Sequence, residues 1–149
     1  MIEMLEQVRK DHEHSQRVTA DKLGVSKSTY ARWETGERII PLNHLNQFCN
    51  FYDVSMDYLI GISKKKNYSN IKIKNIDVNI VAKRLKQIRQ EKGLSQLNFA
   101  NTLNTTQSTI CSYENANTLI ITLFASEICK QNNISLDWLC GRVNDRNPK

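Results

Sequence analysis

Three residues in the first half of the chain have types and a spacing suited to contacts with nucleic acid. Ser28 and Arg32 are four positions apart, so in a helix both side chains project from one face, one turn apart. The fork of Arg32 matches the two acceptors of guanine in the major groove, and Lys27 has the length to reach guanine or a phosphate. The same residues also fit the ordinary solvated charges of a helix surface.

A pair of short helices is predicted to position these residues. Ser15 fits an N-cap before a helix over residues 16–22, and Gly24 supplies the left-handed conformation that ends this helix. Ser26 then fits the cap of a helix over residues 27–34. Two short helices around a glycine turn form the helix-turn-helix unit, whose second helix enters the major groove of DNA.

Three further helices complete the expected module. Leu5 and Val8 place apolar groups on one face of an opening helix, and Pro41 suits the first position of a fourth helix. Ser55 fits the cap of a fifth helix, with Asp57 beside its positive end. The fold class expected for the first 62 residues is therefore all-α, with five helices.

The chain then repeats this module at an offset of 80 residues. Identical residues recur without a gap at Leu5, Gln7, Arg9, Ser15, Gln16, Ala20, Leu23, Ser28, Thr29, Glu34, Ile40, Cys49, Ser55, Asp57, Leu59 and Gly61 and at their counterparts from Leu85 to Gly141. Each copy is one structural unit. We expect a first domain over 1–62, a basic linker over 63–79, a divergent second domain over 80–141 and a tail over 142–149.

The motif resembles the phage-repressor and Cro (Xre-type) helix-turn-helix family, through Ser15-Gln16-x-x-x-Ala20-x-x-Leu23-Gly24-Val25-Ser26-Lys27-Ser28-Thr29-x-x-x-Trp33-Glu34-x-Gly36 and the ending Val54-Ser55-x-Asp57-x-Leu59-x-Gly61. The resemblance implies two tandem five-helix, lambda-repressor-like domains. It also implies an ion pair between Arg9 and Glu34, repeated as Arg89 and Glu114, that ties the first helix of each copy to the end of its third.

The resemblance assigns the DNA contacts of the first copy. Base reading falls to the start of the third helix and one turn further on, and phosphate contact falls to the glutamine after the second helix's cap. Sequence-independent phosphate contacts are expected from Arg38 and the linker lysines. The candidate DNA-binding residues are Gln16, Ser26, Lys27, Ser28, Arg32, Arg38, Lys64, Lys65 and Lys66.

The second copy offers a weaker set at the same positions, namely Gln96, Gln107, Ser108 and Ser112. Residues 104–120 contain no lysine or arginine, so this surface attracts phosphate little. The loop Leu119-Ile120-Ile121 is unusually apolar, which fits a partner interface or the filling of a second core. Reading of DNA and dimerisation therefore both stay open for this copy.

The charge is uneven along the chain. Residues 1–62 carry a net charge of −2, whereas 63–79 and 80–149 carry +4 each, within a total of +6. The linker alternates as Ile71-Lys72-Ile73-Lys74-Asn75-Ile76, which fits a solvated basic linker or an edge strand that pairs with its twin in a dimer. Fully extended, about 17 residues reach roughly 55 Å, enough to join major-groove faces about 34 Å apart.

Several other classes of protein are disfavoured. The four cysteines lack metal-ligand spacing and fit buried reduced thiols, and His12, His14 and His44 lack the company of a metal site. No phosphate-cradling glycine loop or nucleophile elbow is present. We expect no enzyme activity, no cofactor and no metal. The acidic start and the absence of a long apolar run indicate a cytoplasmic protein without a membrane span.

These observations predict a sequence-specific DNA-binding transcriptional regulator, most simply a repressor, that binds double-stranded DNA as a homodimer. The alternative is a protein-interaction module, such as an antitoxin or an assembly partner, that uses the helix-turn-helix fold as a scaffold.

Overall fold

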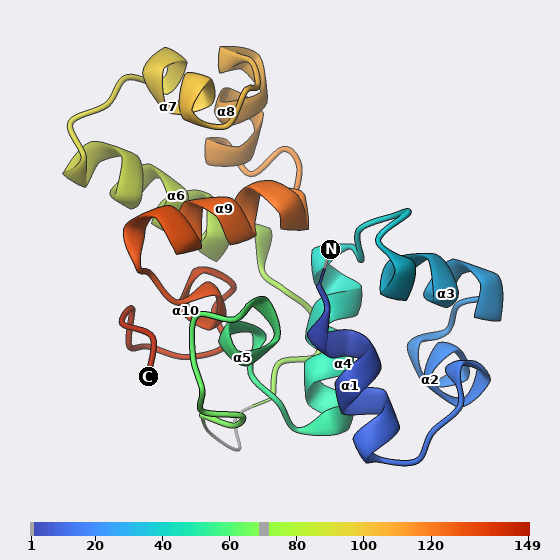
Figure 1. Cartoon of the computed structure of the whole chain (residues 1–149). Coiled ribbons are helices and arrows are strands. Elements are labelled where there is room, and N and C mark those ends of the chain that lie inside the picture. Colours follow the sequence, from blue (N-terminus) through green and yellow to red (C-terminus); the bar gives the residue numbers. More distant parts are fainter. Residues whose placement is uncertain (1, 69–71) are drawn as a thin grey trace. The chain divides into compact units, whose positions relative to one another are not determined.

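The computed structural model describes residues 2–68 and 72–149, which contain ten helices and no strand (Figure 1). Contacts divide the chain into two compact units. Unit 1 comprises Met1–Asn75 with Pro148–Lys149, and unit 2 comprises Ile76–Asn147. Each unit holds five helices, so the prediction of two tandem all-α domains is confirmed.

The helices of unit 1 begin where the sequence offers side-chain caps. Ser15 Oγ accepts from the backbone N–H of Val18, and Ser26 Oγ accepts from that of Thr29 at 3.1 Å. Ser55 caps the last helix in the same way. The five helices are α1 (Met4–Asp11), α2 (Gln16–Leu23), α3 (Lys27–Thr35), α4 (Leu42–Tyr52) and α5 (Met56–Ile60). Pro41 is the N-cap of α4 rather than its first helical residue, because its ψ of 151° is extended.

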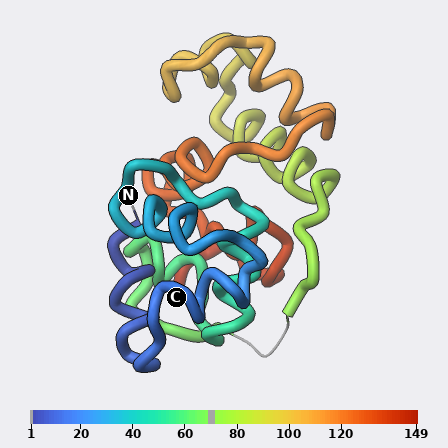
Figure 2. The backbone as a smooth tube through the Cα atoms, turned by 90° about the vertical axis from the view of Figure 1, so that its right-hand side faces the viewer, coloured from blue at the N-terminus to red at the C-terminus, as the bar shows by residue number. Residues whose placement is uncertain are grey.

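Unit 2 repeats this order of helices. Ser95, Thr106 and Ser135 cap the second, third and fifth helices of the unit, at positions equivalent to the three serines of unit 1. The elements are α6 (Val78–Glu91), α7 (Gln96–Thr102), α8 (Gln107–Glu114), α9 (Thr122–Asn132) and α10 (Leu136–Leu139). In both views α10 lies at the end of unit 2 away from α7 and α8 (Figures 1 and 2).

The turns that end the third helices differ between the units. Gly36 ends α3 with φ of 80°, a left-handed conformation that glycine adopts without a steric penalty. Ala116 stands at the equivalent place after α8 and has φ of 59°. A left-handed conformation costs a residue with a Cβ atom roughly 1–2 kcal/mol. The repeat has therefore kept the backbone path of this turn in spite of a less suitable residue.

Each unit has its own core. In unit 1 the fully buried side chains include Leu5, Tyr30, Leu45, Phe48 and Leu59, and in unit 2 they include Leu85, Ile88, Ile110, Ile128 and Leu139. Cys49 and Cys129 are also buried, as their apolar neighbours indicated. The core residues come from all five helices of a unit, and the helix-turn-helix pair is held by contact of α2 with α4 in unit 1 and of α8 with α6 in unit 2.

The segment between the units is fastened to unit 1 over much of its length. The backbone carbonyl of Lys66 accepts from the N–H of Ser55 at 2.5 Å, and the carbonyl of Ile73 accepts from the side-chain amides of Asn46 and Asn50 at 3.0 and 2.7 Å. The described residues 72–76 form no strand, and the carbonyls of Ile73 and Lys74 accept from asparagine side chains of α4 instead. Ile71 lies outside the described residues, and pairing with a second chain stays a prediction.

These anchors also correct the expected reach of the linker. Ile76 is buried and belongs to unit 2. Only three steps along the chain separate it from the anchored Ile73, which span at most about 11 Å. The extended reach of roughly 55 Å is therefore not available while these hydrogen bonds hold.

Candidate nucleic-acid interface

The α2–α3 pair of unit 1 presents the predicted base-reading side chains to solvent. Lys27 and Ser28 are exposed on the first turn of α3, and Arg32 is exposed one turn further on. The Arg32 side chain keeps 48 % of its surface accessible, and its Nε lies 3.7 Å from a Glu37 carboxylate oxygen. An exposed pair of this kind contributes about 0–1 kcal/mol, so a nucleic acid can readily displace it.

Ser26 has a local role in this structure. Its hydroxyl accepts from the backbone N–H of Thr29 and lies 2.9 Å from Thr29 Oγ1 and 3.4 Å from Ser28 Oγ. These bonds fix the start of α3 and orient Ser28. Arg38 is exposed, and its backbone N–H donates to the carbonyl of Arg32 at 3.1 Å, which places it just beyond the same helix.

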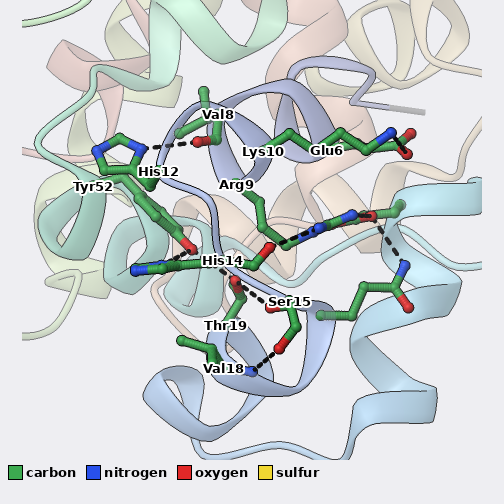
Figure 3. Close-up of polar contacts among 12 residues, drawn as sticks. Glu6, Val8, Arg9, Lys10, His12, His14, Ser15, Val18, Thr19 and Tyr52 are labelled. Carbon is green, nitrogen blue, oxygen red and sulfur yellow. Dashed lines mark hydrogen bonds and ion pairs between the residues drawn. The ribbon is translucent and has the colours of Figure 1, made fainter.

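The predicted ion pair between Arg9 and Glu34 is confirmed. Arg9 donates from Nε and Nη2 to the two Glu34 oxygens at 2.7 and 2.8 Å, and from Nη1 to the carbonyl of His14 (Figure 3). Burial acts to raise the pKa of the Glu34 carboxyl, but hydrogen bonds led by that from Arg9 outweigh it and lower the pKa. Arg89 and Glu114 repeat the geometry in unit 2.

Gln16, the predicted phosphate contact, belongs to the same network. Its Nε2 donates to Glu34 Oε1 at 3.0 Å, and its side chain is half-buried beside the start of α2. In unit 2, Gln96 makes the equivalent bond to Glu114 at a longer 3.3 Å. In each unit, the glutamine at the start of the second helix is thus positioned by its hydrogen bond to the glutamate of the ion pair.

The lysines Lys64, Lys65 and Lys66 are exposed but lie elsewhere on unit 1. Their turn is fastened to α5 through Ser55, and Lys66 Nζ sits 5.9 Å from the centre of the Tyr58 ring. Figure 1 shows α5 on the other side of α1 and α4 from α3. The structure therefore brings Gln16, Lys27, Ser28, Arg32 and Arg38 together, and does not add the three lysines to them.

The sequence-based prediction omitted two exposed cations of α2. Arg17 follows Gln16 at the start of α2, and Lys22 lies near its end, with its Nζ 5.6 Å from the centre of the Phe51 ring on α4. The offset of 80 residues supplies the signal that could have found them. The exposed cations Arg17, Lys22, Lys27, Arg32 and Arg38 of unit 1 correspond to the uncharged residues Leu97, Thr102, Gln107, Ser112 and Thr118 of unit 2.

Unit 2 presents a neutral and partly apolar surface in the same region. Gln107 and Ser108 are exposed, whereas the Ser112 hydroxyl is engaged 3.0 Å from Thr118 Oγ1. The apolar loop divides, because Ile120 enters the core while Ile121 remains 48 % exposed. Leu97 and Leu123, on α7 and α9, are exposed to 51 % and 48 %.

The histidines of the first loop have structural partners. His12 Nδ1 lies 2.9 Å from the carbonyl of Val8, and His14 Nδ1 lies 3.0 Å from the hydroxyl of Tyr52 (Figure 3). Within residues 2–68 and 72–149, no group of three or more metal-ligating side chains is placed to hold an ion. Nor does any described helix combine the length and the apolar character that crossing a membrane requires.

A helix-turn-helix family model matches the chain twice, over residues 5–59 and 85–139. The two matches cover most of the chain, and the protein belongs to this family, of the Xre type, with two tandem copies. Each match begins in the first helix of its unit and ends in the fifth.

Three relatives from Bacillus subtilis (strain 168) show the same likeness. The chain is 37 % identical over 59 residues to the uncharacterized HTH-type transcriptional regulator YobD, 38 % over 65 residues to the HTH-type transcriptional regulator AnsR, and 37 % over 69 residues to the uncharacterized HTH-type transcriptional regulator YqaE. These alignments cover 40, 44 and 46 % of this chain and 53, 56 and 60 % of the relatives. The chain thus spans a little over half of each relative's length. No solved structure gives a significant match.

Proposed function

We propose that the protein is a sequence-specific DNA-binding transcriptional regulator that acts in the cytoplasm on double-stranded DNA. One observation carries the proposal. Unit 1 presents Lys27, Ser28 and Arg32, exposed, on a capped helix that the Arg9–Glu34 pair holds against the rest of the domain. The names of the three relatives, each an HTH-type transcriptional regulator, support it.

Repression is the simplest mode of action for such a protein. A regulator that occupies its operator blocks polymerase without any further activity. In this proposal α3 reads bases, Gln16 positions the domain through a phosphate, and Arg17, Lys22 and Arg38 add sequence-independent attraction. In this proposal unit 2 joins two copies of the chain, because it exposes three large apolar side chains. Leu97, Ile121 and Leu123 stand where unit 1 has Arg17, Pro41 and Asn43.

Selection from a randomised DNA pool with the full-length protein tests the regulator proposal. We expect a short enriched motif, with binding that weakens as salt rises. Enrichment of no motif at low or physiological salt would favour the second candidate, a protein-interaction module. The neutral surface of unit 2 is the observation that supports that candidate.

The role of unit 2 has its own test, with residues taken from unit 1. Leu97→Arg and Leu123→Asn install the unit 1 residues at these exposed positions. We expect the double variant to halve the solution mass measured by light scattering while keeping its helical circular dichroism. Gln107→Ala is the matched control and should leave the mass unchanged. A double variant with the mass of the unchanged protein would remove the assembly role from this surface.

A further inference from the structure

Unit 2 contains a basic pocket that its proposed role in assembly does not use. The pocket has a volume of about 360 Å³ and is lined by Lys83, Arg84, Trp138 and Arg146, among other residues. It lies between the first half of α6, the helix α10 and the turn that follows it. Since α10 is at the end of unit 2 away from α7 and α8, the pocket is remote from the helix-turn-helix pair (Figure 1).

The indole of Trp138 holds two guanidinium groups at the pocket. The guanidinium carbons of Arg84 and Arg146 lie 4.8 and 5.2 Å from the ring centre. Trp138 is itself buried, so its position is fixed by the domain rather than by solvent. Cation–π contacts of this type orient a guanidinium while leaving its N–H donors available.

Arg84 is the unusual member of the set. It is half-buried and donates from Nη1 to the backbone carbonyls of Trp138 and Val143, but among the described residues it makes no ion pair with a carboxylate. Its Nε and Nη2 donors have no partner within the described chain. Burial lowers the pKa of its guanidinium, which reflects the cost of holding a charge away from water.

The neighbouring acids do not neutralise the pocket. Glu91 is bound to Arg146 through two hydrogen bonds of 2.9 and 2.7 Å, and Asp137 is bound to the buried Arg142. Lys83 is exposed and forms no ion pair among the described residues. With Arg146 balanced by Glu91, Lys83 and Arg84 leave an excess of two positive charges at the pocket.

Unit 1 differs at the equivalent positions. Lys83 and Arg84 correspond to Glu3 and Met4. The cations are therefore not a requirement of the five-helix fold, which forms equally well around an acidic and an apolar residue. A half-buried guanidinium with two open donors, beside a lysine in the lining of a half-open pocket, is complementary to an oxyanion, which accepts such bonds in a bidentate manner.

We propose that this pocket binds a small oxyanion, a phosphate or carboxylate group of a soluble ligand, between Lys83 and Arg84, with Arg146, held by Glu91, in the pocket wall. Unit 2 thereby becomes the place where a small anionic effector acts on the protein. The inference does not depend on DNA reading by unit 1, because the pocket is formed by unit 2 alone.

The full-length protein, labelled with ¹⁵N, provides the test through its two indole N–H signals, which Trp138→Phe assigns. We expect addition of inorganic phosphate, against chloride at equal ionic strength, to shift the Trp138 signal saturably while the Trp33 signal stays fixed. Citrate, tested in parallel, distinguishes a carboxylate from a phosphate ligand. Saturable binding of either supports the proposal, and no saturable shift with either overturns it.

Two variants and one control locate the site. Arg84→Met and Lys83→Glu install the residues of unit 1 and should each weaken binding by about tenfold or more, since hydrogen bonds to charged groups contribute about 1.5–3 kcal/mol. Lys86→Glu makes the same charge change on the same helix outside the pocket lining and should weaken binding less than about twofold. Lys83 is exposed, so we expect Lys83→Glu to fold normally. It therefore tests the site even if Arg84→Met fails to fold.

The outcomes are separable from those of the proposed function. Equal weakening by Lys86→Glu and Lys83→Glu would mean general attraction by charge, and would overturn the pocket. A Trp138 signal that responds to a DNA duplex but not to phosphate or citrate would overturn it also. Loss of motif selection by unit 1 would leave the phosphate titration unchanged.

Discussion

Gln16 donates a hydrogen bond to Glu34 at 3.0 Å, and this contact joins the predicted phosphate-binding side chain to the buried ion pair of unit 1. Glu34 accepts from Arg9 through both oxygens, so one carboxylate receives bonds from α1 and from the start of α2. The orientation of the Gln16 side chain is thus set by the buried pair of Arg9 and Glu34. Stability and positioning are coupled at this carboxylate.

Arg9→Ala should lower the free energy of unfolding of unit 1 by about 3–5 kcal/mol, because the charge of Glu34 is left buried and unpaired. Thermal and urea unfolding, followed by circular dichroism, measure the loss. Any loss of DNA binding should track the unfolded fraction. Lys10→Ala, at the exposed neighbouring position, is the control. A fully stable Arg9→Ala protein that no longer bound DNA would instead place Arg9 at the DNA surface.

The stability of unit 1 should depend on pH through Glu34. The folded-state pKa of this carboxyl lies below its ordinary value of 4.5, so its contribution is present above about pH 4.5 and is lost as the pH falls through the folded value. Urea unfolding of the protein and of Glu34→Gln over this range measures it. We expect the advantage of Glu34 to be constant near neutral pH and to shrink in acid. A difference that stayed constant in acid would contradict the assignment.

Arg32→Ala should weaken binding to the selected DNA site by about 1–3 kcal/mol and relax the preference at one base pair, because a bidentate base contact is lost. Fluorescence anisotropy with the selected site and with single-base variants measures both effects. The Arg32 side chain makes an exposed pair with Glu37, so folding should be unaffected by its loss. If the affinity and the selected site were both unchanged, α3 would not be the reading helix.

Replacing Arg17 by Leu and Lys22 by Thr, the residues of unit 2, should weaken binding to all sequences alike. Each lost phosphate contact should reduce the slope of log affinity against log salt by about 1. Lys64, Lys65 and Lys66 changed together to Ala should reduce the slope less, because their turn is fastened to α5. A larger effect from the three lysines would show that DNA reaches the α5 side of unit 1.

Local rules predicted much of the helix-turn-helix pair from the sequence. Ser15, Ser26 and Ser55 cap helices as expected, and Gly24 adopts φ of 68°. These features depend on the residue and its near neighbours, which the sequence displays directly. The buried pair of Arg9 and Glu34 is a longer contact, and its recurrence in the second copy together with the family resemblance made it predictable.

Contacts made by the segments that follow the fifth helix of each unit could not be predicted in this way. The turn of Lys66 folds back on Ser55, and the turn of Arg146 folds back on Ser135 in the same manner. Each fold-back is held by a hydrogen bond between backbone groups. Such a bond requires no particular residue type, so no capping residue or glycine marks it in the sequence. The basic pocket depends on the second of these turns, which brings Arg146 to Trp138. In the sequence, Lys83 and Arg84 lie more than 50 residues from Trp138 and Arg146, and no motif connects them.

The anchoring of Ile73 to α4 leaves only a short stretch of chain between the two units. Because at most about 11 Å of chain separates this anchor from the first residue of unit 2, the two units stay joined by a short covalent connection whichever of them binds a ligand. Encounters between the second unit and groups near the first are then intramolecular, with effective concentrations of order millimolar. If unit 1 binds DNA as proposed, a weak contact of unit 2 with the same DNA therefore adds far more affinity than the same contact made by a separate protein.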